Sequence, residues 1–250
     1  MDNGTVIVTG GASGIGFAAA RRLHEGGWRV ALLDRDQSAL SRAVGEIGSE
    51  STSTHVVDVT DEAAVAQVVA EAAAAGPIRG LVNSAGIAAD VPLAQTSVAL
   101  FRKILDVNVI GSFLLVRNVV PLMEAAGGGS IVNIASVSGL KGNMGRTAYG
   151  ASKGAVVTMT KVMAVELAAS GIRVNAVAPG PVDTPMVLSL HTSVERDVWL
   201  RHVPLRRYAS PDEIAGGIAY LLDESLSSFV TGHVLAIDGG FVAGGTIRPM

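Results

Sequence analysis

The sequence predicts an α/β fold in which helices cover both faces of a parallel sheet. Short runs rich in Val, Ile and Leu alternate with longer Ala-rich segments that carry apolar residues at helical period. Each short run is apolar at nearly every position, as in strands that are buried on both faces. No linker or internal repeat divides the 250 residues. We therefore expect one domain over residues 1–250, with right-handed crossovers between its strands.

The elements follow one another in a regular β-α-β order. The strand-like runs are Thr5–Thr9, Arg29–Asp34, Thr54–Asp58, Gly80–Asn83, Ser130–Ser136, Arg173–Ala178 and His233–Asp238. The helix-like segments lie near residues 14–26, 37–47, 61–75, 97–125, 149–170 and 211–223. Glycines separate the first strand from the first helix, and Gly127–Gly129 ends the longest helix before the fifth strand.

The segment 183–210 interrupts this alternation. It is long, and it mixes Met186, Leu188, Trp199 and Leu200 with polar residues. Long segments inserted in compact α/β domains often cover a site, so we expect a substrate lid. A pair of surface helices without a gating role is the alternative.

Composition excludes several classes of protein. Hydrophobic residues make up 49% and charged residues 16%, which is enough apolar material for a core and too much for a disordered chain. The net charge of −3 comes without a basic block, which argues against a nucleic-acid partner. The chain has no cysteine, so disulfides and thiolate metal sites are excluded. Its five histidines are too scattered to suggest a metal site.

The sequence shows neither a secretion signal nor a membrane span. The apolar strand that contains Val6 and Val8 follows the N-terminus without the charged and apolar stretches of a signal peptide. The longest apolar runs are interrupted by charge or glycine and fall short of the ~20 residues that a membrane span needs. We expect a soluble cytoplasmic protein without a membrane partner.

A glycine-rich loop follows the first strand. Glycines at positions 10, 14 and 16 let the backbone turn tightly and let a phosphate group approach it. The N-terminus of the next helix adds unpaired N–H donors and the positive end of the helix dipole. A glycine pattern alone is weak evidence for dinucleotide binding, because any tight turn between a strand and a helix needs glycine. We expect the diphosphate of a dinucleotide to contact Gly10, Ser13, Gly14, Ile15 and Gly16.

Asp34 closes the second strand, about 20 residues beyond the loop, and strengthens this interpretation. A carboxylate at this place accepts hydrogen bonds from ribose hydroxyls and repels a 2′-phosphate, which favours NAD over NADP. Arg35 is a counter-signal, since arginine can accept a 2′-phosphate, but Ser13 adds no positive charge. The alternative role of Asp34 is to cap the helix that starts near Gln37.

Two further strand ends would border the same ligand. Asp58 and Val59 follow the third strand, where we expect the adenine, and Asn83, Ala85 and Gly86 follow the fourth. Open α/β sheets bind ligands at the carboxyl ends of their strands. Alone, each of these segments could be an ordinary turn.

Tyr149 and Lys153 lie four residues apart and project from the same side of a helix. A nearby ammonium stabilises a phenolate, which lowers the pKa of the phenol from about 10 and makes it a usable general base or acid. Ser136, at the end of the fifth strand, can hydrogen-bond the substrate oxygen. Asn108, in an apolar helical stretch, either caps a local bend or holds a water that relays protons to Lys153. Taken alone, the Tyr–Lys pair could be a solvated surface pair.

A dinucleotide loop and a proton-transfer pair together predict hydride transfer between a nicotinamide and an alcohol or ketone. The motifs resemble those of the short-chain dehydrogenase/reductase family along essentially the whole chain. The residues that carry the resemblance are Thr9-Gly10-x-x-x-Gly14-x-Gly16, Asn83-x-Ala85-Gly86, the tetrad Asn108, Ser136, Tyr149 and Lys153, and the nicotinamide-side motif Pro179-Gly180 with Val182 and Thr184. Ser84 stands where the family often has a second asparagine.

The resemblance implies a Rossmann-type doubly wound parallel sheet of seven strands in the order 3-2-1-4-5-6-7. It implies an NAD-dependent oxidoreductase that interconverts a secondary alcohol and a ketone, with Tyr149 as general acid/base. Ser136 would polarise the carbonyl, Lys153 would bind the nicotinamide ribose and depress the Tyr149 pKa, and Asn108 would hold the relay water. Homotetramers are common in the family, so we expect one here.

The substrate itself is less well defined. The residues expected to contact it are Ser136, Ser138, Met144, Tyr149, Pro181 and Met186. Most of the expected wall is apolar or weakly polar, and Lys141 is the one cation that stands out after the fifth strand. This composition favours a neutral, fairly apolar alcohol or ketone as substrate. A small polyol is the alternative substrate. A catalytically silent NAD-binding regulator and an enoyl reductase are the alternatives. The complete tetrad argues against the first, and the four-residue Tyr–Lys spacing argues against the second.

Overall fold

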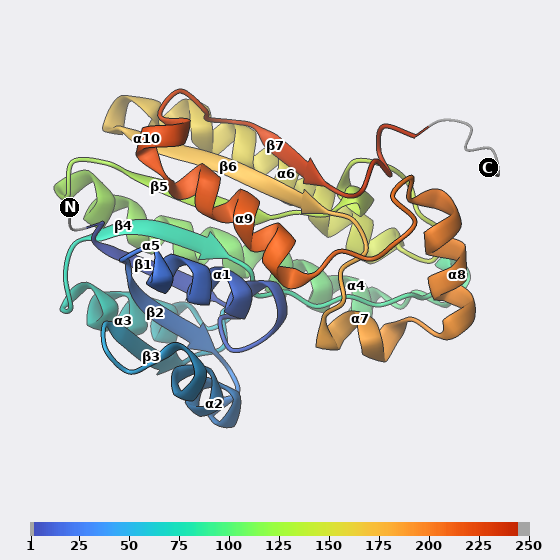
Figure 1. Ribbon diagram of the computed structural model, residues 1–250, viewed down its shortest axis with the longest axis horizontal. Coiled ribbons are helices and arrows are strands. Elements are labelled where there is room, and N and C mark those ends of the chain that lie inside the picture. Colours follow the sequence, from blue (N-terminus) through green and yellow to red (C-terminus); the bar gives the residue numbers. More distant parts are fainter. Residues whose placement is uncertain (1–2, 245–250) are drawn as a thin grey trace.

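The computed structural model describes residues 3–244, and a seven-stranded parallel sheet forms its centre (Figure 1). The strands are β1 (Thr5–Thr9), β2 (Arg29–Asp34), β3 (Thr52–Val56), β4 (Ile78–Asn83), β5 (Gly129–Ile134), β6 (Ile172–Pro179) and β7 (Val234–Ile237). They lie in the order β3-β2-β1-β4-β5-β6-β7, which confirms the predicted fold class and strand order. Residues 1–2 and 245–250 of the expected domain lie outside the described residues.

Helices cover both faces of this sheet, and the alternation of side chains along the strands explains how. In β1, Val6 and Val8 are buried on the side of α1, α2 and α9, whereas Ile7 is buried on the side of α3, α5 and α6. Both faces are therefore apolar, as the continuous hydrophobic runs predict. The helices are α1 (Gly14–Glu25), α2 (Gln37–Ile47), α3 (Glu62–Ala73), α4 (Val98–Leu105), α5 (Ser112–Ala125), α6 (Thr147–Leu167), α7 (Pro185–Leu190), α8 (Ser193–His202), α9 (Pro211–Leu222) and α10 (Glu224–Ser227).

The fifth strand is shorter than the sequence pattern predicts. It ends at Ile134, and Ser136 lies beyond it as the N-cap residue of a 3-10 turn, Val137–Gly139. The Ser136 hydroxyl accepts a hydrogen bond from the backbone N–H of Ser138 at 3.1 Å, which turns the chain away from the sheet. Ser136 is thus a buried residue two positions beyond the strand rather than its last member.

The expected helix 97–125 consists of three parts. Helix α4 is followed by a π-helical turn, Asp106–Gly111, and then by α5. A π turn inserts one residue into a helix and is often found at a functional site. Asn108 lies within it, so the local irregularity that the buried amide suggested is present.

The segment 183–210 forms two short helices, α7 and α8, at the end of the sheet where the strands carry their arrowheads (Figure 1). Its base is closed by backbone hydrogen bonds from Asp183 N–H to the Ala209 carbonyl (2.9 Å) and from Ala209 N–H to the Pro181 carbonyl (3.0 Å). A capping box between Thr192 and Glu195 starts α8. Among residues 3–244, no helix is long and apolar enough to cross a membrane.

Candidate active site

A cavity of about 550 Å³ lies at the carboxyl ends of the central strands. This volume is in the range of sites that bind small molecules and cofactors. Its wall comes from the loops after β1 to β5 and from the starts of α6 and α7. The cavity brings together these predicted residues: Gly10, Ser13, Gly14, Ile15, Asp34, Arg35, Asp58, Val59, Ala85, Gly86, Tyr149, Lys153, Thr184 and Met186.

The loop between β1 and α1 is held too tightly for any side chain at Gly16. A Cβ atom there would lie 2.2 Å from the backbone oxygen of Gly10, which is far inside van der Waals contact. The hydroxyl of Thr9 accepts hydrogen bonds from the backbone N–H groups of Ser84 and Ala85, both at 3.0 Å. The loop after β1 is thereby fixed against the loop after β4, and the N-terminus of α1 borders the cavity.

Asp34 ends β2, whereas Lys153, on the same helix as Tyr149, is bonded to the end of β5, and β1 and β4 lie between these two strands. The Asp34 carboxylate accepts backbone hydrogen bonds from Ala12 (3.4 Å) and Asp36 (3.2 Å). The capping role that Asp34 could have had belongs to Asp36, whose side chain accepts the Ala39 N–H at 3.0 Å. Two arginines, Arg35 and Arg42, line the same cavity.

Asp58 lies near Asp34 in this part of the cavity, after the end of β3. Its carboxylate accepts hydrogen bonds from the backbone N–H (2.9 Å) and the hydroxyl (2.7 Å) of Thr60. These bonds, with a smaller contribution from the Arg35 charge, lower the pKa of Asp58 and keep it ionised.

Lys153 is buried on α6, and its Nζ donates a hydrogen bond to the Ile134 carbonyl at 2.6 Å. Burial lowers the pKa of this ammonium to about 8. The same Nζ lies 5.8 Å from the centre of the Tyr149 ring. The helix therefore brings the two side chains together, as their spacing predicts.

The pKa of Tyr149 differs from the expectation that a neighbouring ammonium would lower it. Burial raises the pKa above its ordinary value, while a hydrogen bond with Ser136 and the charge of Arg146 act in the opposite direction. Asp90 adds a further increase. Desolvation of the phenolate outweighs the favourable contacts that the chain itself provides.

Asn108 connects two parts of the site. Its Oδ1 accepts the Ile87 N–H at 2.8 Å, and its Nδ2 donates to the Ile87 carbonyl and to the Ser152 hydroxyl, both at 3.0 Å. The backbone carbonyl of Asn108 accepts a hydrogen bond from the Ser112 hydroxyl at 2.9 Å. The side chain thus ties the loop after β4 to α6, next to Tyr149 and Lys153.

Several predicted residues lie outside the cavity wall. Gly180 packs against Asp238, and Met144 is fully exposed. Asn83 donates its amide to the side chain of Asn133 at 2.9 Å, so it links β4 to β5. The predicted residues that are not part of the wall are Gly16, Asn83, Asn108, Ser136, Ser138, Met144, Pro179, Gly180, Pro181 and Val182.

Arg146 is not among the predicted site residues, although it lies just before Tyr149. Its guanidinium lies 5.2 Å from the Tyr149 ring centre and pairs with Asp90. Its position three residues before Tyr149, at the N-cap of α6, was the only signal in the sequence. The wall residues that were not predicted are Ala12, Leu33, Asp36, Ala39, Arg42, Val57, Ser84, Ile87, Val107, Ile134 and Pro185.

Comparison with known proteins shows which family the chain belongs to. A family model described as Enoyl-(Acyl carrier protein) reductase matches residues 10–242. The chain belongs to the short-chain dehydrogenase/reductase family. Members of this family use the nicotinamide cofactors NAD or NADP, and the family includes dehydrogenases that act on alcohols.

Individual relatives match over nearly their full length. Galactitol 2-dehydrogenase (L-tagatose-forming) of Cereibacter sphaeroides is 42% identical over 244 residues, which cover 96% of each chain. Cis-4-hydroxycyclohexanecarboxylate dehydrogenase of Sinomonas cyclohexanicum is 42% identical over 241 residues, 95% of this chain and 96% of that one. A solved structure titled short chain dehydrogenase/reductase family protein is 38% identical, with a TM-score of 0.89 over 97% of this chain and 99% of the other.

Proposed function

We propose that this protein is an NAD-dependent oxidoreductase that interconverts a secondary alcohol and a ketone. The observation that carries the proposal is the content of one cavity. Asp34 ends β2, the glycine loop follows the neighbouring β1, and Lys153, on the same helix as Tyr149, is bonded to the end of β5, so the strand order places the glycine loop between Asp34 and the Tyr–Lys pair. A cavity of about 550 Å³ with this order of groups suits an extended dinucleotide whose nicotinamide would lie beside the phenol.

The loop geometry supports a bound diphosphate. Gly10 and Gly14 line the cavity without a side chain, and the N-terminus of α1 offers N–H donors there. Asp34 supports NAD over NADP, because its carboxylate would repel a 2′-phosphate. Arg35 and Arg42 beside it reduce that preference, so we propose NAD as the preferred rather than the exclusive cofactor.

The proposed chemistry divides between the cofactor and the chain. When bound, the nicotinamide supplies or accepts the hydride. The Tyr149 phenol takes the proton from the alcohol in oxidation and returns it in reduction. Ser136 donates a hydrogen bond to the substrate oxygen and orients it. Lys153 contributes a positive charge beside the phenol, and Asn108 holds the loop at Ile87 and the start of α6 in register.

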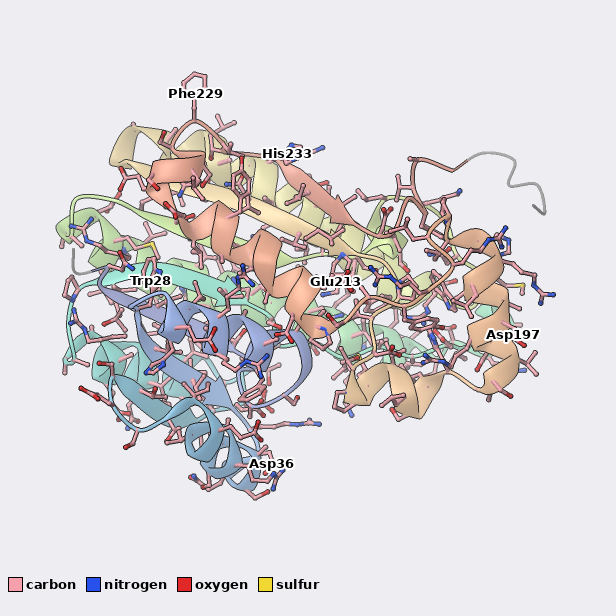
Figure 2. All side chains as sticks on the ribbon, in the orientation of Figure 1. Trp28, Asp36, Asp197, Glu213, Phe229 and His233 are labelled. Carbon is pink, nitrogen blue, oxygen red and sulfur yellow. The ribbon has the colours of Figure 1, made fainter. Side chains whose placement is uncertain are left out.

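We further propose that residues 183–210 act as a substrate lid, because Thr184 and Met186 line the cavity while α8 lies outside it. The names of both reported relatives describe alcohols on a carbon chain or ring, which supports a secondary alcohol as substrate. A cytoplasmic homotetramer is the proposed state. It is supported by exposed apolar side chains on several elements, of which Phe229 projects fully into solvent beyond α10 (Figure 2).

The test is turnover by purified protein with a panel of secondary alcohols and ketones, followed at the nicotinamide absorbance with NAD and with NADP. The variant Tyr149→Phe is expected to lose nearly all turnover while it still binds NADH, because it keeps the ring and removes only the hydroxyl. Turnover that survives in this variant contradicts the role of Tyr149. NADH binding without consumption of any ketone in the wild-type protein would favour a cofactor-binding regulator.

A further inference from the structure

Arg146 occupies an unusual place for an arginine. It is the residue that precedes α6, and its side chain is only 10% exposed. The guanidinium lies over the face of the Tyr149 ring, 5.2 Å from the ring centre. A cation at this distance interacts favourably with the phenol ring and more strongly with a phenolate, which carries a full negative charge.

Two residues from distant parts of the chain hold this guanidinium. Asp90, in the loop after β4, forms an ion pair with it and accepts a hydrogen bond from Nη2 at 2.8 Å. His191, directly after α7, lies with its Nε2 3.0 Å from the same Nη2. The cluster therefore joins the loop after β4, the start of α6 and the proposed lid.

The shorter contacts of His191 favour a neutral ring, although its Nε2 also lies 3.8 Å from Asp90 Oδ2. An arginine can only donate, so the Nε2 of His191 must accept and carries no proton. The proton then lies on Nδ1, which is 2.9 Å from the Tyr208 hydroxyl and can donate to it. Burial, followed by the charge of Arg146, lowers the pKa of His191, which agrees with a neutral ring. A protonated His191 would turn an N–H toward the guanidinium and break this contact.

We propose that Arg146 is a positioning residue for proton transfer by Tyr149: held by Asp90 and by neutral His191, it stabilises the phenolate relative to the phenol. This inference rests on the proposed function, because it concerns the proton that Tyr149 exchanges. The pKa of the buried Lys153 is lowered to about 8, whereas arginine side chains are always charged in proteins. The guanidinium is thus a constant positive charge beside the phenol.

The charged groups around the phenol act with different signs. Arg146 and Lys153 both lie near the face of the ring, and Asp90 opposes them. Two further charges act on the clamp, by which we mean Arg146 with Asp90 and His191. Glu195 raises the pKa values of Asp90 and His191, while Arg196 lowers that of His191. Removal of Arg146 and removal of the Asp90 charge should therefore shift the Tyr149 titration in opposite directions.

The experiment compares Arg146→Gln, Asp90→Asn and the double variant with the wild-type protein. The first readout is the near-ultraviolet absorbance of tyrosinate as a function of pH, with the signal of Tyr149→Phe subtracted, since the chain has three tyrosines. We expect the midpoint of Tyr149 to rise in Arg146→Gln, to fall in Asp90→Asn and to lie between these in the double variant. This measurement requires no substrate.

The second readout is the pH dependence of kcat/KM for alcohol oxidation. Arg146→Gln should lose about tenfold on the acidic side of the profile, which corresponds to about 1.4 kcal/mol of transition-state stabilisation. Arg146→Lys should regain part of this loss, because it restores a charge without the planar fork. Arg21→Gln, which removes a surface arginine paired with Asp212, is the matched control and should behave like the wild type.

Circular dichroism and NADH fluorescence establish that each variant is folded and binds the cofactor. If Arg146→Gln does not fold, the downward shift in Asp90→Asn and the behaviour of Arg146→Lys still decide the question. Shifts of the same sign in both single variants, or no shift in either, overturn the inference. Wild-type protein that oxidises no alcohol would contradict the proposed function instead, and the tyrosinate titration would still test Arg146.

Discussion

Replacement of Gly16 by alanine tests the cofactor loop most directly. The added Cβ would lie 2.2 Å from the Gly10 oxygen and 2.8 Å from the Gly10 carbonyl carbon. Both are backbone atoms of the turn between β1 and α1, so neither can move aside in the way a flexible side chain can. The turn has to open, and with it the surface that is proposed to hold the diphosphate.

The expected cost follows from the kind of clash. Overpacking in a well-packed region costs about 1–3 kcal/mol, and a clash with backbone lies at the upper end of that range. For a chain of this size, about 2–3 kcal/mol corresponds to a melting temperature lower by roughly 5–10 °C. The matched control is Gly45→Ala in α2, where nothing lies within 4 Å of the added Cβ. Alanine inside a helix is more stable than glycine by about 0.5–1 kcal/mol, so the control should melt slightly higher.

The assay is thermal unfolding with and without NADH. A ligand at 100 times its Kd stabilises the folded state by about 2.7 kcal/mol, so wild type and Gly45→Ala should both melt at clearly higher temperature with NADH. Gly16→Ala should melt lower without NADH and gain little from it. If Gly16→Ala melts like the wild type and gains as much from NADH, the loop does not hold the diphosphate in the proposed way.

Three further predictions concern charge. Asp34→Ala should raise kcat/KM with NADP relative to NAD by at least about tenfold, because Arg35 and Arg42 then face a 2′-phosphate without a competing carboxylate; an unchanged ratio, measured with both cofactors, would contradict this. Lys153→Met should lower kcat by about 100-fold or more. Thermal unfolding should show equal or higher stability, since the variant removes a buried cation. A large loss of stability would contradict the stability prediction. Folding lowers the pKa of His191, so the unfolded chain binds a proton on this ring more readily than the folded protein does. The free energy of unfolding should therefore decrease as the pH falls below about 6.5. His191→Gln, which keeps a hydrogen-bond acceptor for Arg146, should show a smaller decrease in melting temperature between pH 7.5 and 5.5.

The strands and the motif residues could be predicted because their signals are local. Strands covered on both faces read as continuous apolar runs, and β1 and β2 match the predicted ranges. The edge strand β3 begins and ends two residues earlier than expected, at Thr52 and Val56, because its sequence is polar and its outer side has no neighbour to bury. The helix 97–125 kept its apolar period across the π turn, so the pattern alone did not reveal the interruption at Asn108.

The environment of Tyr149 could not be predicted in the same way. Its spacing to Lys153 is a property of one helix, whereas Asp90 and His191 lie 56 and 45 positions from Arg146 along the chain. Each of these two residues, taken alone, is an ordinary polar residue of a loop or helix end. Only the packing of the segment 183–210 over the loop after β4 brings them to one arginine.

Burial shifts the two pKa values of the Tyr149–Lys153 pair against the chemistry proposed for them. It raises the pKa of the phenol and lowers that of the ammonium to about 8, so near and above pH 8 the pair moves toward its neutral form. A phenolate in this environment needs a positive charge that does not titrate. Arg146 meets this requirement, since arginine side chains are always charged in proteins and this one is held over the ring by Asp90. The clamp on Arg146 therefore provides the constant part of the electrostatic support for Tyr149, and Lys153 provides the part that is lost as the pH rises.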